Sequence, residues 1–187
     1  MKILKLTLSL IIFAWCTGFF YFINYTKNIT NTNRNITQAI VVYGGNKERL
    51  YVGAQLLKMG YSPIVYITGD KPKEEYDNFI RVNNLIPAQF IFDHSLTTNN
   101  LEAIEDSLDF MKKYELHTAR VVINSTQLPR AKIDFASKVP REIKFIPHVV
   151  SRKGEKHFKV FVEYFKYSIA LLASFVGIEN ELNLSYS

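Results

Sequence analysis

Residues 38–60 read QAIVVYGGNKERLYVGAQLLKMG, and this stretch predicts a strand, a tight turn and a helix. Residues 39–43 are apolar, mostly bulky or β-branched, and end at a glycine pair, which is typical of a strand buried on both faces. In residues 50–57 apolar side chains recur at helical spacing, and Gly60 stands where a left-handed helix C-cap is favoured. Another apolar run begins at residue 63, so the stretch predicts a β-α-β unit with parallel strands and a right-handed crossover.

The same alternation of short apolar runs and helical patterns continues along the chain. It predicts an α/β fold: a three-layer, doubly wound sandwich with a mainly parallel sheet of about five strands, Rossmann-like. Ligands of such sheets bind beyond the carboxyl ends of the strands. The further strands are expected at 63–67, 90–92, 120–123 and 143–146, with helices over 73–85, from 101, from 129 and over 158–177.

The N-terminus predicts a membrane anchor. Residues 6–25 carry no charge, and about 20 residues suffice to span about 30 Å of hydrocarbon. Lys2 and Lys5 precede this run, so by the positive-inside bias residues 1–5 would stay in the cytoplasm. We therefore expect a single-pass membrane protein whose domain lies on the outer side of the membrane. A cleaved signal peptide is the alternative, although residues 14–16 (Ala-Trp-Cys) are a poor cleavage site.

The rest of the chain divides into three parts. Residues 26–37 form a polar linker that we expect to be flexible. Residues 38–178 form the α/β domain, and residues 179–187 a C-terminal tail. Cys16 is the only cysteine and lies in the anchor, so within one chain neither a disulfide nor a cysteine metal site can form.

The composition and charge of the chain limit the classes of partner that we expect it to bind. The formal net charge is +6 and the pI about 9.3, which permits contact with anionic lipid, phosphate or nucleic acid. We expect no nucleic acid partner, because no arginine-rich run or binding motif accompanies the charge. The four histidines show no ligand spacing, so we expect no metal site, and we expect no cofactor.

Polar loops follow the predicted strands and would meet at one edge of the sheet. They supply glycine backbone N–H groups, hydroxyls, amides and two arginines, a combination that suits anions and phosphate above all. Each residue also has a plainer interpretation, for example Arg49 as a solvated first-turn arginine. The candidate ligand-binding residues are Gly44, Gly45, Arg49, Thr68, Gly69, Asp70, Ser95, Thr98, Asn100, Ser125, Gln127 and Arg130. The weaker catalytic candidates are Asp70, His94 and Glu102.

Five of these motifs, taken in order over about residues 38 to 176, resemble the SanA/ElyC/YdcF-like family, a bacterial envelope-associated domain of unknown function. The motifs are Gly44-Gly45 with Arg49, Ala54, Leu57 and Gly60; Thr68-Gly69; Ser95 with Thr98; Ser125 with Arg130-Ala131; and the late Glu163-Tyr164. The resemblance implies a location in the bacterial inner (plasma) membrane, with the domain facing the periplasm or outside. It also implies a role in cell-wall (peptidoglycan) and envelope biogenesis and in barrier function.

The chain departs from the family pattern at two places. Asn100-Leu101 stands where the family has Glu-Asn, leaving Glu102 only by a shift of register. Gln127 stands where the family has His, and glutamine cannot shuttle a proton. Binding without turnover is therefore our first hypothesis: a membrane-anchored protein that binds a phosphorylated ligand, lipid-linked ligands included.

Two alternatives stay open. The protein could be a hydrolase or transferase acting on a phosphate ester or glycan precursor. It could also be a non-catalytic interaction module with a vestigial pocket, working through a basic loop over 148–157 and the last helix. That helix carries an uncharged stretch over 167–178, which is too short to span a bilayer. Packing on the sheet and lying on the membrane surface are both compatible with it.

Overall fold

The computed structural model of the chain describes residues 2–43, 47–69, 72–93, 100–151 and 157–184. Its centre is a five-stranded sheet in the order β3-β2-β1-β4-β5, and every strand pair is parallel. The predicted α/β, Rossmann-like fold is therefore confirmed. The strands are β1 (Ala39–Tyr43), β2 (Val65–Thr68), β3 (Phe90–Phe92), β4 (Thr118–Asn124) and β5 (Lys144–Val150).

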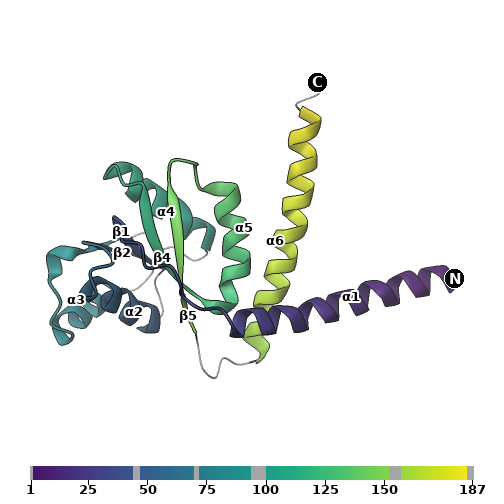
Figure 1. The fold of residues 1–187 in the computed structure, drawn as a ribbon, viewed down its shortest axis with the longest axis horizontal. Coiled ribbons are helices and arrows are strands. Elements are labelled where there is room, and N and C mark those ends of the chain that lie inside the picture. The colour runs from purple at the N-terminus through teal and green to yellow at the C-terminus, as the bar shows by residue number, and fades with distance from the viewer. Residues whose placement is uncertain (1, 44–46, 70–71, 94–99, 152–156, 185–187) are drawn as a thin grey trace.

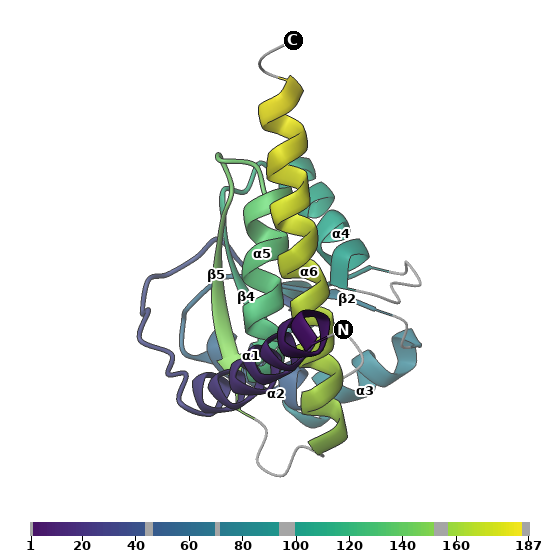
Figure 2. The ribbon, with the colours of Figure 1, turned by 90° about the vertical axis from the view of Figure 1, so that its right-hand side faces the viewer.

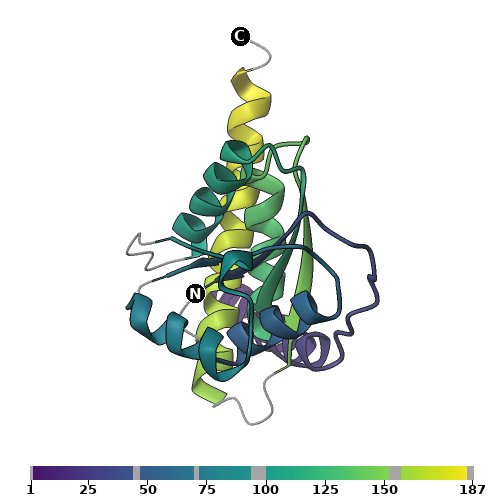
Figure 3. The same ribbon diagram turned by 90° about the vertical axis from the view of Figure 1, so that its left-hand side faces the viewer.

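Helices cover both faces of this sheet (Figures 1 and 3). The apolar side chains of β1 alternate between two cores, as the period of two in a strand requires. Ile40 and Val42 pack with α2 and α3, while Val41 and Tyr43 pack with α4 and α5. The helices of these layers are α2 (Lys47–Lys58), α3 (Lys73–Val82), α4 (Asn100–Lys113) and α5 (Leu128–Lys138), with short 3-10 turns η1 (Pro87–Gln89) and η2 (Ser125–Gln127).

Glycines set the position and the end of α2. A Cβ on Gly53 would meet Val42 Cγ2 at 2.6 Å, so the absence of a side chain there lets the helix lie close to β1. Gly60 follows the helix with φ of +78°, the left-handed conformation that glycine adopts without strain. The sequence prediction for Gly60 is thus confirmed.

Two long helices stand outside the sandwich. α1 (Lys2–Lys27) and α6 (His157–Leu184) both extend beyond the domain and run in different directions (Figures 1 and 2). Among the described residues, α1 is the one helix long and apolar enough to cross a membrane. The most apolar 18 residues of α1 have a mean hydropathy of 2.0, and 6% of them are buried within the protein.

The linker between α1 and β1 is held against the domain rather than hanging free. Arg120 on β4 is 1% exposed and donates hydrogen bonds to the backbone carbonyls of Asn33 and Asn35, at 3.1 and 2.5 Å. The ring of Tyr61 lies 4.7 Å from its guanidinium carbon, and burial lowers the pKa of this arginine. Our expectation of a flexible linker is therefore wrong, because polarity alone did not reveal that a buried cation needs these carbonyls.

A second linker contact fixes the edge of the sheet. The side-chain amide of Asn31 donates to Val149 O at 2.8 Å and accepts from Val149 N at 2.7 Å. β5 runs to Val150, so His148 lies in this strand and not in the basic loop that the sequence predicted over residues 148–157. Burial, and after it the charge of Arg120, lowers the pKa of His148 to about 4.

Candidate functional site

The sheet has one point at which its strand order reverses. From β1 the chain proceeds outward to β2 and β3, then returns to place β4 on the other side of β1. α2 and α5, which follow β1 and β4, consequently pack on opposite faces of the sheet, and the crevice between two such strands is where doubly wound sheets bind ligands. The first turn of α2 and the 3-10 turn η2 lie at this end of the two strands.

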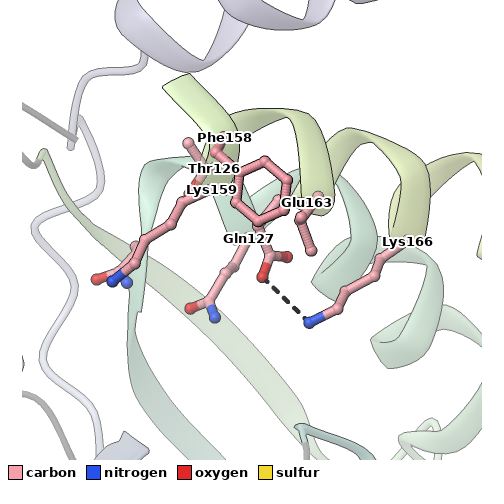
Figure 4. Close-up of a pocket in the computed structure, with 8 residues that line it drawn as sticks. Thr126, Gln127, Phe158, Lys159, Glu163 and Lys166 are labelled. Carbon is pink, nitrogen blue, oxygen red and sulfur yellow. Dashed lines mark ion pairs between the residues drawn. The ribbon is translucent and has the colours of Figure 1, made fainter. Parts of the chain in front are cut away.

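A cavity of about 400 Å³ lies beyond the carboxyl end of β4. One wall comes from the last residue of β4 and from η2, and the other from the first turns of α6 (Figure 4). The helix that leaves the sandwich thus closes the end of the sheet. The lining residues are Asn124, Thr126, Gln127, Phe158, Lys159, Val162, Glu163 and Lys166.

Three buried polar atoms in this lining have no hydrogen-bond partner among the described residues. They are Asn124 Oδ1 and Thr126 Oγ1, on residues that are 8% and 4% exposed, and Glu163 Oε2, which lies 3.9 Å from Arg130 Nη2. Buried polar atoms are nearly always hydrogen-bonded, and an unpaired one costs about 1–3 kcal/mol. Polar groups left unpaired in a cavity are typical of a site whose partner is a ligand or solvent.

Arg49 reaches the same place from the opposite side of the switch point. Its Nη1 donates to Gln127 Oε1 at 3.2 Å, and the residue is 9% exposed. Its interpretation as a solvated surface arginine is therefore wrong. The guanidinium orients the Gln127 amide, which leaves the Nε2 donor end of that amide for other contacts in the cavity.

Two carboxylates, Asp134 of α5 and Glu163 of α6, lie near Arg130 at one side of the site. Glu163 lies 3.9 Å from Arg130 Nη2 and 3.6 Å from Lys166 Nζ, the latter contact drawn in Figure 4. Arg130 Nη1 is also 3.7 Å from Asp134 Oδ2. Burial raises the pKa of the Asp134 carboxyl above its ordinary value, and the charge of Arg130 offsets part of that increase. Arg130 therefore serves two carboxylates, whereas Lys159 has no ion pair within the described ranges.

The structure brings some of the predicted residues together and separates others. Arg49 and Gln127 are in contact, and Arg130 meets the lining residue Glu163. Thr68, 1% exposed and with no partner for its hydroxyl in the described chain, is paired in register with Tyr43 of β1. Ser125 is buried at the start of η2, beside the lining residues.

Other predicted residues do not line the cavity or fall outside the description. Glu102 is exposed in the first turn of α4, away from the lining residues, and Gly69 follows β2 with φ of +131°. The carboxylate of Asp93, directly after β3, accepts a hydrogen bond from the Tyr66 hydroxyl at 2.7 Å. Residues outside the described chain are Gly44, Gly45, Asp70, His94, Ser95 and Thr98, together with the side chain of Asn100.

Sequence reasoning missed the α6 wall of the cavity as a site. Lys159, Glu163 and Lys166 follow one another at intervals of four and three, which places them on one side of a helix. Charged residues at that spacing in an otherwise apolar helix were the available signal. Asn124 and Thr126 stand in the polar loop after the strand predicted at 120–123. Their residue types gave no further signal, because polar residues are ordinary in loops.

Fold and site together define the class: a parallel α/β domain with a ligand-sized cavity at its switch point, preceded by a helix able to cross a membrane. No family model matches the chain. It is 30% identical to the uncharacterized protein RC1356 of Rickettsia conorii over 166 residues, covering 87% of this chain and 96% of the relative. It is 26% identical to the uncharacterized protein RP875 of Rickettsia prowazekii over 160 residues, covering 84% and 91%. The chain therefore belongs to the same family as RC1356.

Proposed function

We propose that this protein is a membrane-anchored binding protein for a phosphorylated ligand, lipid-linked ligands included. The ligand phosphate binds in the cavity at the carboxyl end of β4. The observation that carries the proposal is the pair of buried, unpaired polar atoms, Asn124 Oδ1 and Thr126 Oγ1, in a cavity flanked by lysines.

The charges of the cavity support an anionic ligand. Lys159 and Lys166 line it, and Arg49 lies behind Gln127. The carboxylate of Glu163 is already opposed by Arg130 and Lys166, so the surplus charge in the lining is positive. Charge-assisted hydrogen bonds of this kind are about twice as strong as neutral ones.

The lining residues divide the work in this proposal. Lys159 and Lys166 neutralise the phosphate, and the Thr126 hydroxyl and the Gln127 amide donate to its oxygens. Asn124 Oδ1 accepts a hydroxyl or amide proton from the remainder of the ligand. Arg130, which two carboxylates engage, positions Glu163 and does not touch the phosphate.

The cellular setting is part of the proposal. We infer that α1 anchors the chain in a bacterial inner membrane with the domain outside the cytoplasm. The motifs shared with the SanA/ElyC/YdcF-like family favour a role in cell-wall and envelope biogenesis. The apolar character of α1 supports the anchor.

A thermal-shift measurement on the full chain in detergent tests the binding. The probes are inorganic phosphate, a sugar nucleotide and a short-chain polyprenyl phosphate. A ligand that binds only the folded state raises Tm, and the rise grows with the ratio of the ligand concentration to its Kd. We expect at least one probe to do so, and Lys159→Ala/Lys166→Ala to raise its Kd by about tenfold or more.

The matched control is Lys112→Ala/Lys113→Ala, which removes the same charge from the last turn of α4. This control should keep the ligand-induced shift. A shift lost equally in both double variants would mean general charge attraction. No shift with any of the three probes would contradict the proposal.

A further inference from the structure

α6 carries a continuous apolar stripe on the face turned away from the sandwich. Its members follow one another at intervals of three and four residues, which is the spacing of one helix face. Each is between 40% and 67% exposed. They are Phe161, Phe165, Ile169, Leu172 and Val176.

The opposite face of α6 is the one that packs on the protein. Tyr164 is 5% exposed, and Glu163 and Tyr167 are half-buried beside it. α6 contacts α5 and η2 along this side. The stripe is therefore a second apolar face that the domain itself does not use, and unpartnered apolar faces of this length mark interaction sites.

The stripe is continuous with the surface of α1. Phe161 packs edge-on against Trp15 and Phe19 of α1, with ring centroids 5.6 and 5.8 Å apart. Tyr164 OH donates to the backbone carbonyl of Trp15 at 2.8 Å. Gly18 lets the helices come this close, since a Cβ there would meet Tyr164 OH at 2.5 Å.

The arrangement of the two helices fits one flat environment. α1 projects away from the domain past α6, and α6 runs across it (Figures 1 and 2). A bilayer that α1 enters would thus meet α6 along its length.

We propose that the occupant of the stripe is the lipid bilayer itself, with α6 lying at the boundary between headgroups and hydrocarbon. This inference rests on the membrane anchoring by α1 proposed above. It places the bilayer boundary near Trp15 and Phe19, where aromatic side chains are favoured. The segment of α1 within the bilayer is then residues 2–19, about 27 Å of helix, instead of 6–25, with the ammonium groups of Lys2 and Lys5 extending to the far headgroup layer.

Fluorescence of the full chain in vesicles of phosphatidylcholine and phosphatidylglycerol tests the proposal. In a Cys16→Ser background, Ile169→Cys carries an environment-sensitive label, and nitroxides on the lipid acyl chains act as quenchers. Leu10→Cys on α1 is the membrane reference and Val82→Cys on α3 the water reference, all three positions being exposed. We expect the Ile169→Cys label to shift to the blue and to be quenched about as strongly as that at Leu10→Cys.

Each other outcome overturns the proposal. An Ile169→Cys label that behaves like the Val82→Cys label shows that the stripe faces water. A blue shift without quenching by the lipids shows that a second copy of the chain covers it. Absence of quenching at Leu10→Cys overturns the anchoring and this inference together, whereas quenching at Leu10→Cys alone overturns only this inference.

The single tryptophan gives a test without any label, since Trp15 lies at the crossing of α1 and α6. Lipids brominated near the headgroup should quench its fluorescence more than lipids brominated deep in the chain. Stronger quenching by the deep bromines would place Trp15 at the bilayer centre, as a span over 6–25 requires, and would overturn the proposed boundary.

Discussion

The two ends of the sheet differ in how their polar groups are satisfied. At the amino ends of the strands, the Gln38 side chain accepts from the backbone N–H groups of His117 and Thr118 at 2.7 and 3.0 Å. Arg120 donates to two linker carbonyls there, although its Nε is buried and has no hydrogen-bond partner among the described residues. At the carboxyl ends, Asn124 and Thr126 keep buried polar atoms that no described residue pairs.

This difference separates stability from function. A hydrogen bond completed inside the protein contributes to folding, whereas a buried polar group held unpaired is destabilising until something binds it. Under the proposed function, the contacts at the amino ends contribute to stability and the polar groups at the carboxyl ends contribute to binding. Substitutions at the two ends should differ in both the size and the direction of their effects.

The largest effect should come from Arg120→Met. The substitution leaves the carbonyls of Asn33 and Asn35 without their donor and removes the contact with Tyr61, so we expect a loss of about 3 kcal/mol in unfolding free energy. Thermal unfolding of the full chain in detergent, followed by circular dichroism, measures it. Arg34→Met, at an exposed position of the same linker, should change stability by less than about 0.5 kcal/mol. Equal Tm values for the two variants would break the comparison.

The second effect is a pH dependence from His148 at the sheet's β5 edge. Its pKa is lowered from 6.5 to about 4 by burial and by Arg120, so the unfolded chain takes up this proton first as the pH falls. The stability it contributes is complete above pH 6.5 and is lost progressively between 6.5 and 4. Tm recorded across this window should fall less steeply in His148→Gln than in wild type. His117→Gln, which removes an exposed histidine, should follow the wild-type curve.

The smallest effect on stability should come from Thr126→Val, at the carboxyl end. Valine is nearly isosteric and removes an unpaired buried hydroxyl, so Tm should stay unchanged or rise by an amount equivalent to about 1 kcal/mol. Binding of the phosphate probe should weaken at the same time. A clear fall in Tm would mean that the hydroxyl is satisfied in the folded protein and that the two ends do not differ as described.

The elements of the fold were predictable because their patterns are local. β1 and β3 occupy the predicted residues 39–43 and 90–92, and the glycine after α2 has the expected conformation. The strand β5 was predicted too short because Pro147 and His148 resemble a loop. Its last residues are held by Asn31, a contact between positions 118 residues apart that no local pattern records.

The site was predictable only in part, for the same physical reason. Arg49 and Gln127 could be assigned to one edge because parallel strands bring their carboxyl ends together. The wall of the cavity that α6 forms could not be assigned to this edge from the sequence. The direction in which the last helix leaves the sheet depends on its packing against α5 and α1. The burial of Arg49 likewise follows from its contact with η2 and not from its own helix.

The linker amide of Asn31 has a consequence for encounters between copies of this protein. β3 and β5 are the outer strands of the sheet, and outer strands invite pairing with another chain. β3 has only three residues, and β5 contains Pro147. Asn31 occupies both backbone groups of Val149, as one residue of an added strand would. A neighbour's strand would have to displace that amide before it could pair, so the linker between α1 and β1 opposes edge-to-edge pairing of two copies.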